Sequence, residues 1–136
     1  MTLFQVFDIA GSGMAAQSVR LNTIASNLAN ADNVAGSPDE VYRARHPVFA
    51  SVLEEAAGEG AVAPRLLGIV EQGGEPDRRY DPGNPVADAE GYVYRARVDP
   101  ITEMVDMISA SRSFQHNVEV LGTVKQLMLA TLRLGQ

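Results

Sequence analysis

All seven prolines of this 136-residue chain lie between residues 38 and 100, so neither end of the chain contains one. Proline removes a backbone N–H and clashes with the preceding turn, which excludes it from the interior of a long helix. The two proline-free ends therefore predict two long helices, one over residues 3–30 and one beginning at Asp99-Pro100. The proline-containing middle is predicted to be non-helical.

The first end has apolar residues at alternating spacings of four and three. The eight positions of this seam, of which only Gln17 is polar, are Leu3, Phe7, Ala10, Met14, Gln17, Leu21, Ile24 and Leu28. This heptad pattern is typical of a helix that packs along another helix. Gly11 and Gly13 each lower helix stability by about 1 kcal/mol relative to alanine. We therefore expect this helix to depend on a partner.

The last end has the features of a capped helix with more apolar surface than one stripe. Asp99 is the expected N-cap, Pro100 the first helical residue, and Glu103 lies near the positive end of the helix dipole. Apolar residues follow at helical spacings: Met104, Met107, Ile108, Phe114, Val118, Leu121, Val124, Leu127, Met128 and Leu132. Val105, Val120 and Leu129 fall outside that stripe, so the helix needs cover on more than one side. We interpret the surplus as an interface with other subunits; a core helix of a compact bundle is the alternative.

The middle of the chain reads as short strands separated by turns. Turn-forming residues at Gly73-Gly74 and 80–85 separate strand-like runs at 41–45, 48–53, 66–71 and 91–98. The small, acidic segment 54–64 is expected to be a loop. The predicted fold is α+β and mainly α: a long antiparallel, coiled-coil-like helix pair with a small β-hairpin-rich middle. The expected parts are the N-terminal helix, 1–33, the β-rich middle, 34–98, and the C-terminal helix, 99–136.

One pentapeptide, Val-Tyr-Arg-Ala-Arg, occurs twice, at 41–45 and at 93–97. Both copies alternate large apolar or small residues with arginine, as a half-buried strand does. We predict that the two copies pair and clamp the helices together, with chance repetition as the alternative. Paired strands would gather four arginines into a basic strip, Arg43, Arg45, Arg95 and Arg97, suited to acidic neighbours or to intramolecular ion pairs.

Residues that could carry chemistry are few. Gly11-Ser12-Gly13, with Asp32 about twenty residues on, resembles a dinucleotide-binding fingerprint, but that fingerprint needs a preceding strand, and here the heptad seam runs through the glycines. There is no cysteine, and neither His46 nor His116 has a second ligand at metal-binding spacing. We therefore predict no catalytic residue, no cofactor and no metal site. A net charge of −6 argues against nucleic-acid binding, and the absence of a long apolar run argues against direct membrane insertion.

The end of the first predicted helix carries a specific motif, Ser26-Asn27-Leu28-Ala29-Asn30. With residues 17–25, it resembles the N-terminal motif of the bacterial flagellar axial proteins, the rod, hook and hook-associated proteins. Residues 103–121 are similar to the C-terminal helix of that family, and residues 80–93 and the short length are similar to a proximal-rod member. The threonine that often follows the motif in relatives is absent here.

The resemblance implies a structural subunit of the flagellar basal-body rod, which assembles helically with copies of itself and other rod subunits and transmits torque from motor to hook. It implies export through the type III export apparatus without a cleaved signal peptide, a place in the periplasmic rod, and contact with the membrane ring or its adaptor at the rod base. Two alternatives stay open: a small nucleotide-binding enzyme using Gly11-Ser12-Gly13, and an export-linked chaperone or adaptor.

The predicted site residues come from the apolar patterns of the two helices and from the family motif. Asn27 and Asn30 are expected to satisfy backbone groups where the first helix ends, a place where asparagine tolerates the left-handed conformation. The residues expected to pack helix against helix and subunit against subunit are Leu3, Phe7, Met14, Leu21, Ile24, Leu28, Met104, Ile108, Phe114, Val118, Leu121, Val124, Met128 and Leu132.

Overall fold

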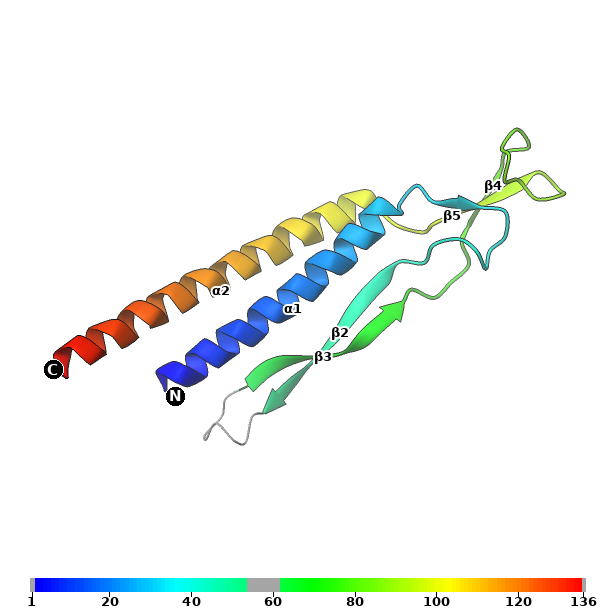
Figure 1. Ribbon diagram of the computed structural model, residues 1–136. Helices are drawn as coiled ribbons and strands as arrows, with labels where there is room; N and C mark the ends of the chain where they lie inside the picture. Colours follow the sequence, from blue (N-terminus) through cyan, green and yellow to red (C-terminus); the bar gives the residue numbers. More distant parts are fainter. Residues whose placement is uncertain (1, 54–61, 136) are drawn as a thin grey trace. The chain divides into compact units, whose positions relative to one another are not determined.

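The computed structural model describes residues 2–53 and 62–135, which form two long helices and two small sheets (Figure 1). The helices are α1 (Leu3–Ala29) and α2 (Pro100–Leu134). The strands are β1 (Val34–Ala35), β2 (Arg45–Leu53), β3 (Val62–Glu71), β4 (Asp77–Tyr80) and β5 (Tyr92–Arg95). The two predicted terminal helices and the α+β class are confirmed. Of the predicted loop 54–64, residues 54–61 lie outside the described residues, and residues 62–64 belong to β3.

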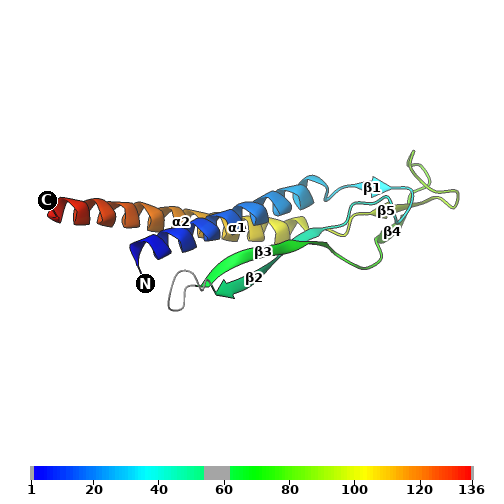
Figure 2. The same cartoon turned by 60° about the horizontal axis from the view of Figure 1, so that its bottom comes forward.

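The chain forms two compact units, and each helix contributes to both. The first unit contains residues 1–21, 47–68 and 108–136, and the second contains residues 22–46 and 69–107. Within each unit the segments of α1 and α2 lie side by side and run in opposite directions (Figures 1 and 2). Each unit therefore brings together segments that are far apart in the sequence.

Both helices begin with side-chain caps. At the start of α1, the Gln5 amide donates a hydrogen bond to the Thr2 hydroxyl, and the Thr2 amide donates to the Gln5 side-chain oxygen. This reciprocal pair is a capping box. At the start of α2, the Asp99 carboxylate accepts a hydrogen bond from the Ile101 amide, as predicted for an N-cap. The hydrogen bonds from the Thr102 hydroxyl and the Ile101 amide lower the pKa of Asp99 below its ordinary value of 3.8.

The first unit packs small side chains where α1 meets α2. Ala10 and Ala110 are buried, together with Val124 further along α2. A Cβ added to Gly13 would lie 2.9 Å from the Asn117 side-chain nitrogen, whereas one added to Gly11 would meet nothing within 4 Å. Gly13 therefore allows a close approach between the helices, and Gly11 has no such role within the chain.

The three-stranded sheet of the second unit has the order β1-β5-β4 and is antiparallel. Arg95 of β5 lies opposite Val34 on one side and opposite Asp77 on the other. β2 and β3 form a separate two-stranded sheet. The predicted runs 48–53 and 66–71 lie within these two strands, and β5 lies within the predicted run 91–98.

The prediction that the two pentapeptides pair with each other was wrong. Residues 41–44 lie outside any strand, and β5, which holds most of the second copy, pairs with β1 and β4 instead. Both copies nevertheless bury the same two positions, Val41 with Ala44 and Val93 with Ala96. The repeat therefore reports a shared pattern of burial at its first and fourth positions. It carries no information about which strand lies beside it.

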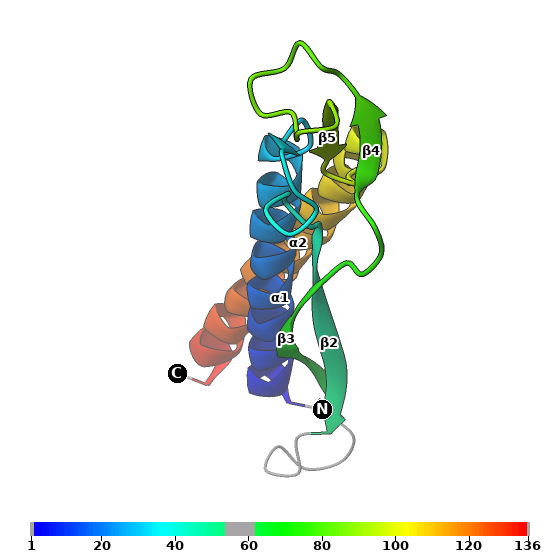
Figure 3. The ribbon, with the colours of Figure 1, turned by 90° about the vertical axis from the view of Figure 1, so that its right-hand side faces the viewer.

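The connection between β4 and β5 is the turn that the residues at 80–85 predicted (Figure 3). Asp88 accepts hydrogen bonds from the backbone amides of Glu90 and Tyr92, and the Asp81 amide donates to the Gly91 carbonyl. Gly91 has a φ of +84°, and a Cβ there would lie 3.0 Å from the ring of Tyr80. The turn thus needs a glycine at residue 91.

Candidate functional site: the asparagine cluster at the end of the first helix

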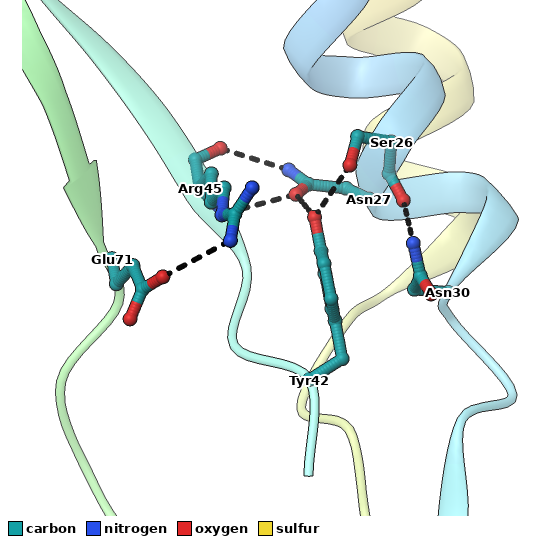
Figure 4. Close-up of polar contacts among 6 residues, drawn as sticks. All are labelled: Ser26, Asn27, Asn30, Tyr42, Arg45 and Glu71. Carbon is teal, nitrogen blue, oxygen red and sulfur yellow. Dashed lines mark hydrogen bonds and ion pairs between the residues drawn. The ribbon is translucent and has the colours of Figure 1, made fainter. Parts of the chain in front are cut away.

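The most deeply buried large side chain among the described residues is polar. Asn27, in the last turns of α1, is 1% exposed. Its side-chain nitrogen donates hydrogen bonds to the Arg45 carbonyl at 2.9 Å and to the Glu103 carboxylate at 3.1 Å. Its side-chain oxygen accepts from the Arg45 amide at 2.9 Å and from the Tyr42 hydroxyl at 2.8 Å (Figure 4). These four bonds use both donors and both acceptor positions of the amide.

The Asn27 amide substitutes for a neighbouring strand. It exchanges one donated and one accepted hydrogen bond with the backbone of Arg45, as a hydrogen-bonded residue of an antiparallel strand does. Arg45 is the first residue of β2, so this exchange holds the start of β2 against the last turns of α1. The bond to Glu103, which is 7% exposed, joins the same side chain to the first turn of α2. One side chain therefore connects three elements of the second unit.

Three further side chains surround Asn27 (Figure 4). The Tyr42 hydroxyl has one proton, which it donates to Asn27, so the Ser26 hydroxyl, 3.0 Å away, donates to Tyr42. The Asn30 side-chain nitrogen donates to the Ser26 carbonyl at 2.9 Å. We call this group of residues the asparagine cluster: Ser26, Asn27, Asn30, Tyr42, Arg45 and Glu103.

The structure separates the two predicted asparagine roles. Asn30 satisfies the carbonyl of Ser26 in the last turn of α1, as predicted. Asn27 satisfies backbone groups of Arg45 instead of those at the helix end. No non-glycine residue in the described ranges has a positive φ, so the left-handed conformation suggested for these asparagines was wrong.

Sequence reasoning missed the partners of the motif. Tyr42, Arg45 and Glu103 lie 15, 18 and 76 residues away from Asn27, and no periodicity connects positions so far apart. Tyr42 and Arg45 did stand out as members of the repeated pentapeptide. Their predicted role, however, was in a strand pair that does not form.

The four arginines of the two pentapeptides do not form the predicted basic strip, because the segments do not pair. Arg45 forms an ion pair with Glu71 at 3.3 Å, and Arg95 forms one with Asp32 at 2.9 Å. All four side chains of these pairs are largely exposed, so each pair contributes at most about 1 kcal/mol. Arg43 donates a weak hydrogen bond to the Gly74 carbonyl at 3.4 Å.

The residues proposed for helix and subunit packing divide by exposure. Those that are buried or half-buried are Leu3, Met14, Leu21, Ile24, Leu28, Phe114, Leu121, Val124 and Met128. Those that are exposed are Phe7, Met104, Ile108, Val118 and Leu132. Val105, Val120 and Leu129, outside the main stripe of α2, are exposed as well. The rest of the described chain therefore leaves a large apolar surface on α2 uncovered.

The positions considered for chemistry are parts of the scaffold. Gly11 and Gly13 lie inside α1, with no strand before them in the described residues, so the nucleotide-fingerprint interpretation is wrong. His116 lies 3.6 Å from Glu119 on the exposed side of α2. Within residues 2–53 and 62–135, no group of three histidines or acids is placed to hold a metal ion. Neither helix combines the length and apolarity that a membrane span requires.

Comparison with known proteins places this framework in a family. The family model described as "Flagella basal body rod protein" matches residues 7–36, which include most of α1 and its motif. The model described as "Flagellar basal body rod FlgEFG protein C-terminal" matches residues 89–134, which include β5 and α2.

Relatives match over the whole length of both chains. The flagellar basal-body rod protein FlgC of Salmonella typhimurium is 51% identical, and those of Escherichia coli O157:H7 and Yersinia enterocolitica are 52% and 53% identical. In each case the match covers all of this chain and all of the relative. The chain belongs to the FlgC family of flagellar basal-body rod proteins.

Proposed function

We propose that this chain is a structural subunit of the bacterial flagellar basal-body rod, that it assembles with other rod subunits and with copies of itself, and that it catalyses no reaction. The observation that carries the proposal is its identity of 51–53% with named rod proteins over the full length of both chains. Identity at that level supports a shared fold and shared contacts. A structural role also agrees with a most buried side chain, Asn27, whose hydrogen bonds all serve to connect elements.

The exposed apolar residues of α2 supply the surface for assembly. Ile101 is 74% exposed, Val105 61% and Leu132 68%. Burying a large aliphatic side chain completely contributes about 1.5–3 kcal/mol, so covering several of them drives association strongly. Exposed apolar surface of this extent on one helix supports a binding surface for other proteins. We assign Phe114, Leu121, Val124 and Met128, which are buried or half-buried in the chain, to the opposing face of the helix pair, and Leu132, which is exposed, to the subunit contacts.

The helix pair is the proposed mechanical element. We propose that α1 and α2 pack in a coiled-coil-like manner in the assembled rod, along the seam of Leu3, Phe7, Met14 and the later apolar positions of α1. In this arrangement 1–33 and 99–136 form the axial core, and 34–98 forms the β-rich middle. The contact of Gly13 with Asn117 supports close packing. Close-packed side chains resist deformation, which suits a subunit that transmits torque from motor to hook.

The export route and the neighbouring proteins are proposed from the family resemblance. We propose that the chain is exported by the type III export apparatus without signal cleavage and resides in the periplasmic rod. Its proposed neighbours are other rod subunits and, at the rod base, the membrane ring or its adaptor. These proposals rest on the resemblance of Ser26–Asn30 and of residues 103–121 to the axial proteins.

The test is complementation of motility with a matched pair of substitutions at one residue. In cells whose own copy is deleted, the parent chain should restore swimming and appear in purified basal bodies. Leu121→Asp, which places a charge at a half-buried position of the proposed helix and subunit packing, should be produced at the parent level but abolish swimming. Leu121→Met, which keeps the position apolar, should swim.

Two outcomes would contradict the proposal. Normal swimming with Leu121→Asp would remove this face from the assembly. A functional parent chain that stays in small cytoplasmic complexes and never reaches basal bodies would indicate an export chaperone or adaptor instead.

A further inference from the structure

One buried acceptor atom in the first unit has no hydrogen-bond partner. Gln17 is the one polar residue of the α1 seam, and its side-chain oxygen is buried without a hydrogen bond. Among the described residues it is the only buried side-chain nitrogen or oxygen in that condition. A buried oxygen that has lost water and gained no donor destabilises the arrangement that holds it. An arrangement that supplies a donor to Gln17 would therefore be more stable at this point.

A matching donor lies on the facing helix. The side-chain nitrogen of Asn117, on α2, lies 2.9 Å from the position that a Cβ on Gly13 would take. Asn117 is half-buried, and its side-chain amide forms no hydrogen bond with any residue of 2–53 or 62–135. The contact between the two helices thus contains an amide donor on α2 and an amide acceptor on α1, neither of them paired.

The two amides are within reach of each other. Gly13 and Gln17 are four residues apart, so they lie on the same face of α1, about 6 Å apart along its axis. Side chains of a helix point back toward its N-terminus, so the Gln17 side chain extends toward the turn that contains Gly13. Because Gly13 has no side chain, the Asn117 amide lies directly against that turn. A small movement of α2 along α1 is enough to join donor and acceptor.

We propose that the Asn117 amide donates a hydrogen bond to the Gln17 side-chain oxygen when the helix pair packs into the rod, and that this bond fixes the register of α1 against α2. A single polar position in an apolar helix seam specifies how two helices pair, at a cost in stability. The inference rests on the proposed function, because it needs an assembled rod.

Assembly can supply the movement because exposed apolar residues stand beside Asn117. Val118 is 46% exposed and Val120 is 41% exposed, and both belong to the apolar surface that neighbours are proposed to cover. Neighbours shift a conformational equilibrium toward the arrangement that they bind more tightly. Packing against these valines is therefore the step that moves Asn117 toward Gln17.

The test is Gln17→Met, which keeps the length of the side chain and removes its amide. In the isolated chain the substitution removes an unpaired acceptor, so the urea midpoint of unfolding should rise. In the rod it removes the bond, so complete basal bodies should become about fivefold fewer, as expected for the loss of one hydrogen bond. A residue that only fills the helix contact would change both measurements in the same direction.

Two further variants identify the bond and its partner. Gln115→Met makes the same change at an exposed glutamine of α2 and should alter neither measurement. Asn117→Leu, which removes the proposed donor at similar size, should also lower the number of complete basal bodies. The double variant Gln17→Met/Asn117→Leu should be no worse than the worse single variant, because both substitutions remove the same bond.

Three results would overturn the proposal. Basal bodies could be as numerous with Gln17→Met as with the parent chain, or the losses from the two single variants could add in the double variant. A lower urea midpoint for Gln17→Met would show that Gln17 is already paired in the isolated chain. Absence of the parent chain from basal bodies would instead refute the proposed function, so the two failures are distinguishable.

Discussion

The asparagine cluster and the exposed apolar residues of α2 differ in which kind of side chain is buried. In the cluster, polar groups are buried and every hydrogen-bonding position of Asn27 is used within the chain. On α2, large apolar residues such as Ile101 and Leu132 are exposed. Buried polar groups are costly when unpaired, so they fix one arrangement of the chain that contains them. Exposed apolar groups cost the isolated chain little and gain free energy only when another molecule covers them.

The difference teaches how one short chain can be both a folded unit and a component of a larger assembly. Polar contacts specify the internal joint between α1, β2 and α2. Apolar contacts are left for neighbours. Substitutions in the two regions should therefore affect different measurements, and the predictions below run from the largest expected effect on the isolated chain to the smallest.

The largest effect is expected from Asn27→Leu. The leucine is of similar size but leaves the Arg45 amide and carbonyl, the Tyr42 hydroxyl and the Glu103 carboxylate without their partner. Each unsatisfied buried group costs about 1–3 kcal/mol, so the free energy of unfolding should fall by more than about 3 kcal/mol. Urea unfolding followed by circular dichroism would measure it.

The matched control for that prediction is Asn22→Leu, an exposed asparagine on the same helix. It should change the free energy of unfolding by less than about 0.5 kcal/mol. Equal effects of the two substitutions would show that the cluster contributes no more than ordinary helix surface.

Glycine substitutions in α1 should separate open from closely packed positions. Gly11→Ala adds a Cβ with nothing within 4 Å, so it should stabilise the chain by about 1 kcal/mol through helix propensity. Gly13→Ala places its Cβ 2.9 Å from the Asn117 side-chain nitrogen and should stabilise less or destabilise. Thermal unfolding of both variants checks this, and Gly13→Ala/Asn117→Ala should recover the difference. Equal gains at both glycines would mean that the helices are not closely packed at Gly13.

A smaller effect on the stability of the fold should depend on pH. Hydrogen bonds from Thr102 and Ile101 lower the pKa of Asp99 in the folded chain. A lowered folded pKa means that this group stabilises the fold above its unfolded pKa, the ordinary value of 3.8, and that the contribution is lost as the pH falls through the lowered value. Asp99→Asn keeps an acceptor for the cap but does not titrate. The stability of this variant should decline less than that of the parent between pH 5 and pH 2. Parallel curves for the two proteins would contradict the capping assignment.

The smallest effect on the isolated chain is expected from Leu132→Lys. Leu132 is 68% exposed, and a cation in the last turn of a helix agrees with the dipole, so the free energy of unfolding should change by less than about 0.5 kcal/mol. Rod assembly should fail nevertheless, because an ammonium group would be buried in an apolar contact. Sedimentation of basal bodies, beside urea unfolding of the monomer, measures both. A variant that assembles normally would show that this part of α2 remains exposed in the rod.

The sequence predicts the helices well because their signals are local. Each of these signals acts within a few residues: the proline boundaries, the Asp99 cap and the apolar spacing. The helices α1 and α2 occupy the segments that these signals predict. Strand pairing depends on distant residues. The repeated pentapeptide marks two segments with the same buried positions, such as Val41 and Val93, but it does not show that β1 and β4 lie beside β5.

The candidate site was predictable only in part for the same reason. The Ser26–Asn30 motif stands out in the sequence, and the contact of Asn30 with Ser26 lies within one helical turn. Asn27 depends on Arg45 and Glu103, whose positions follow from the completed fold. An exposed fraction of only 1% for an asparagine is a property that spacing does not reveal.

The bond between Asn27 and Glu103 spans 76 residues and so also concerns the order of folding. Contacts between distant positions carry the entropic cost of closing a long loop, and they form late. The amide of Asn27 cannot reach its full set of partners until residue 103 is present beside it. A chain that passes through a narrow export channel one end first would therefore keep its two ends apart until nearly all of it had emerged. Under the proposed export route, the joint that fixes the folded subunit would form only at the destination.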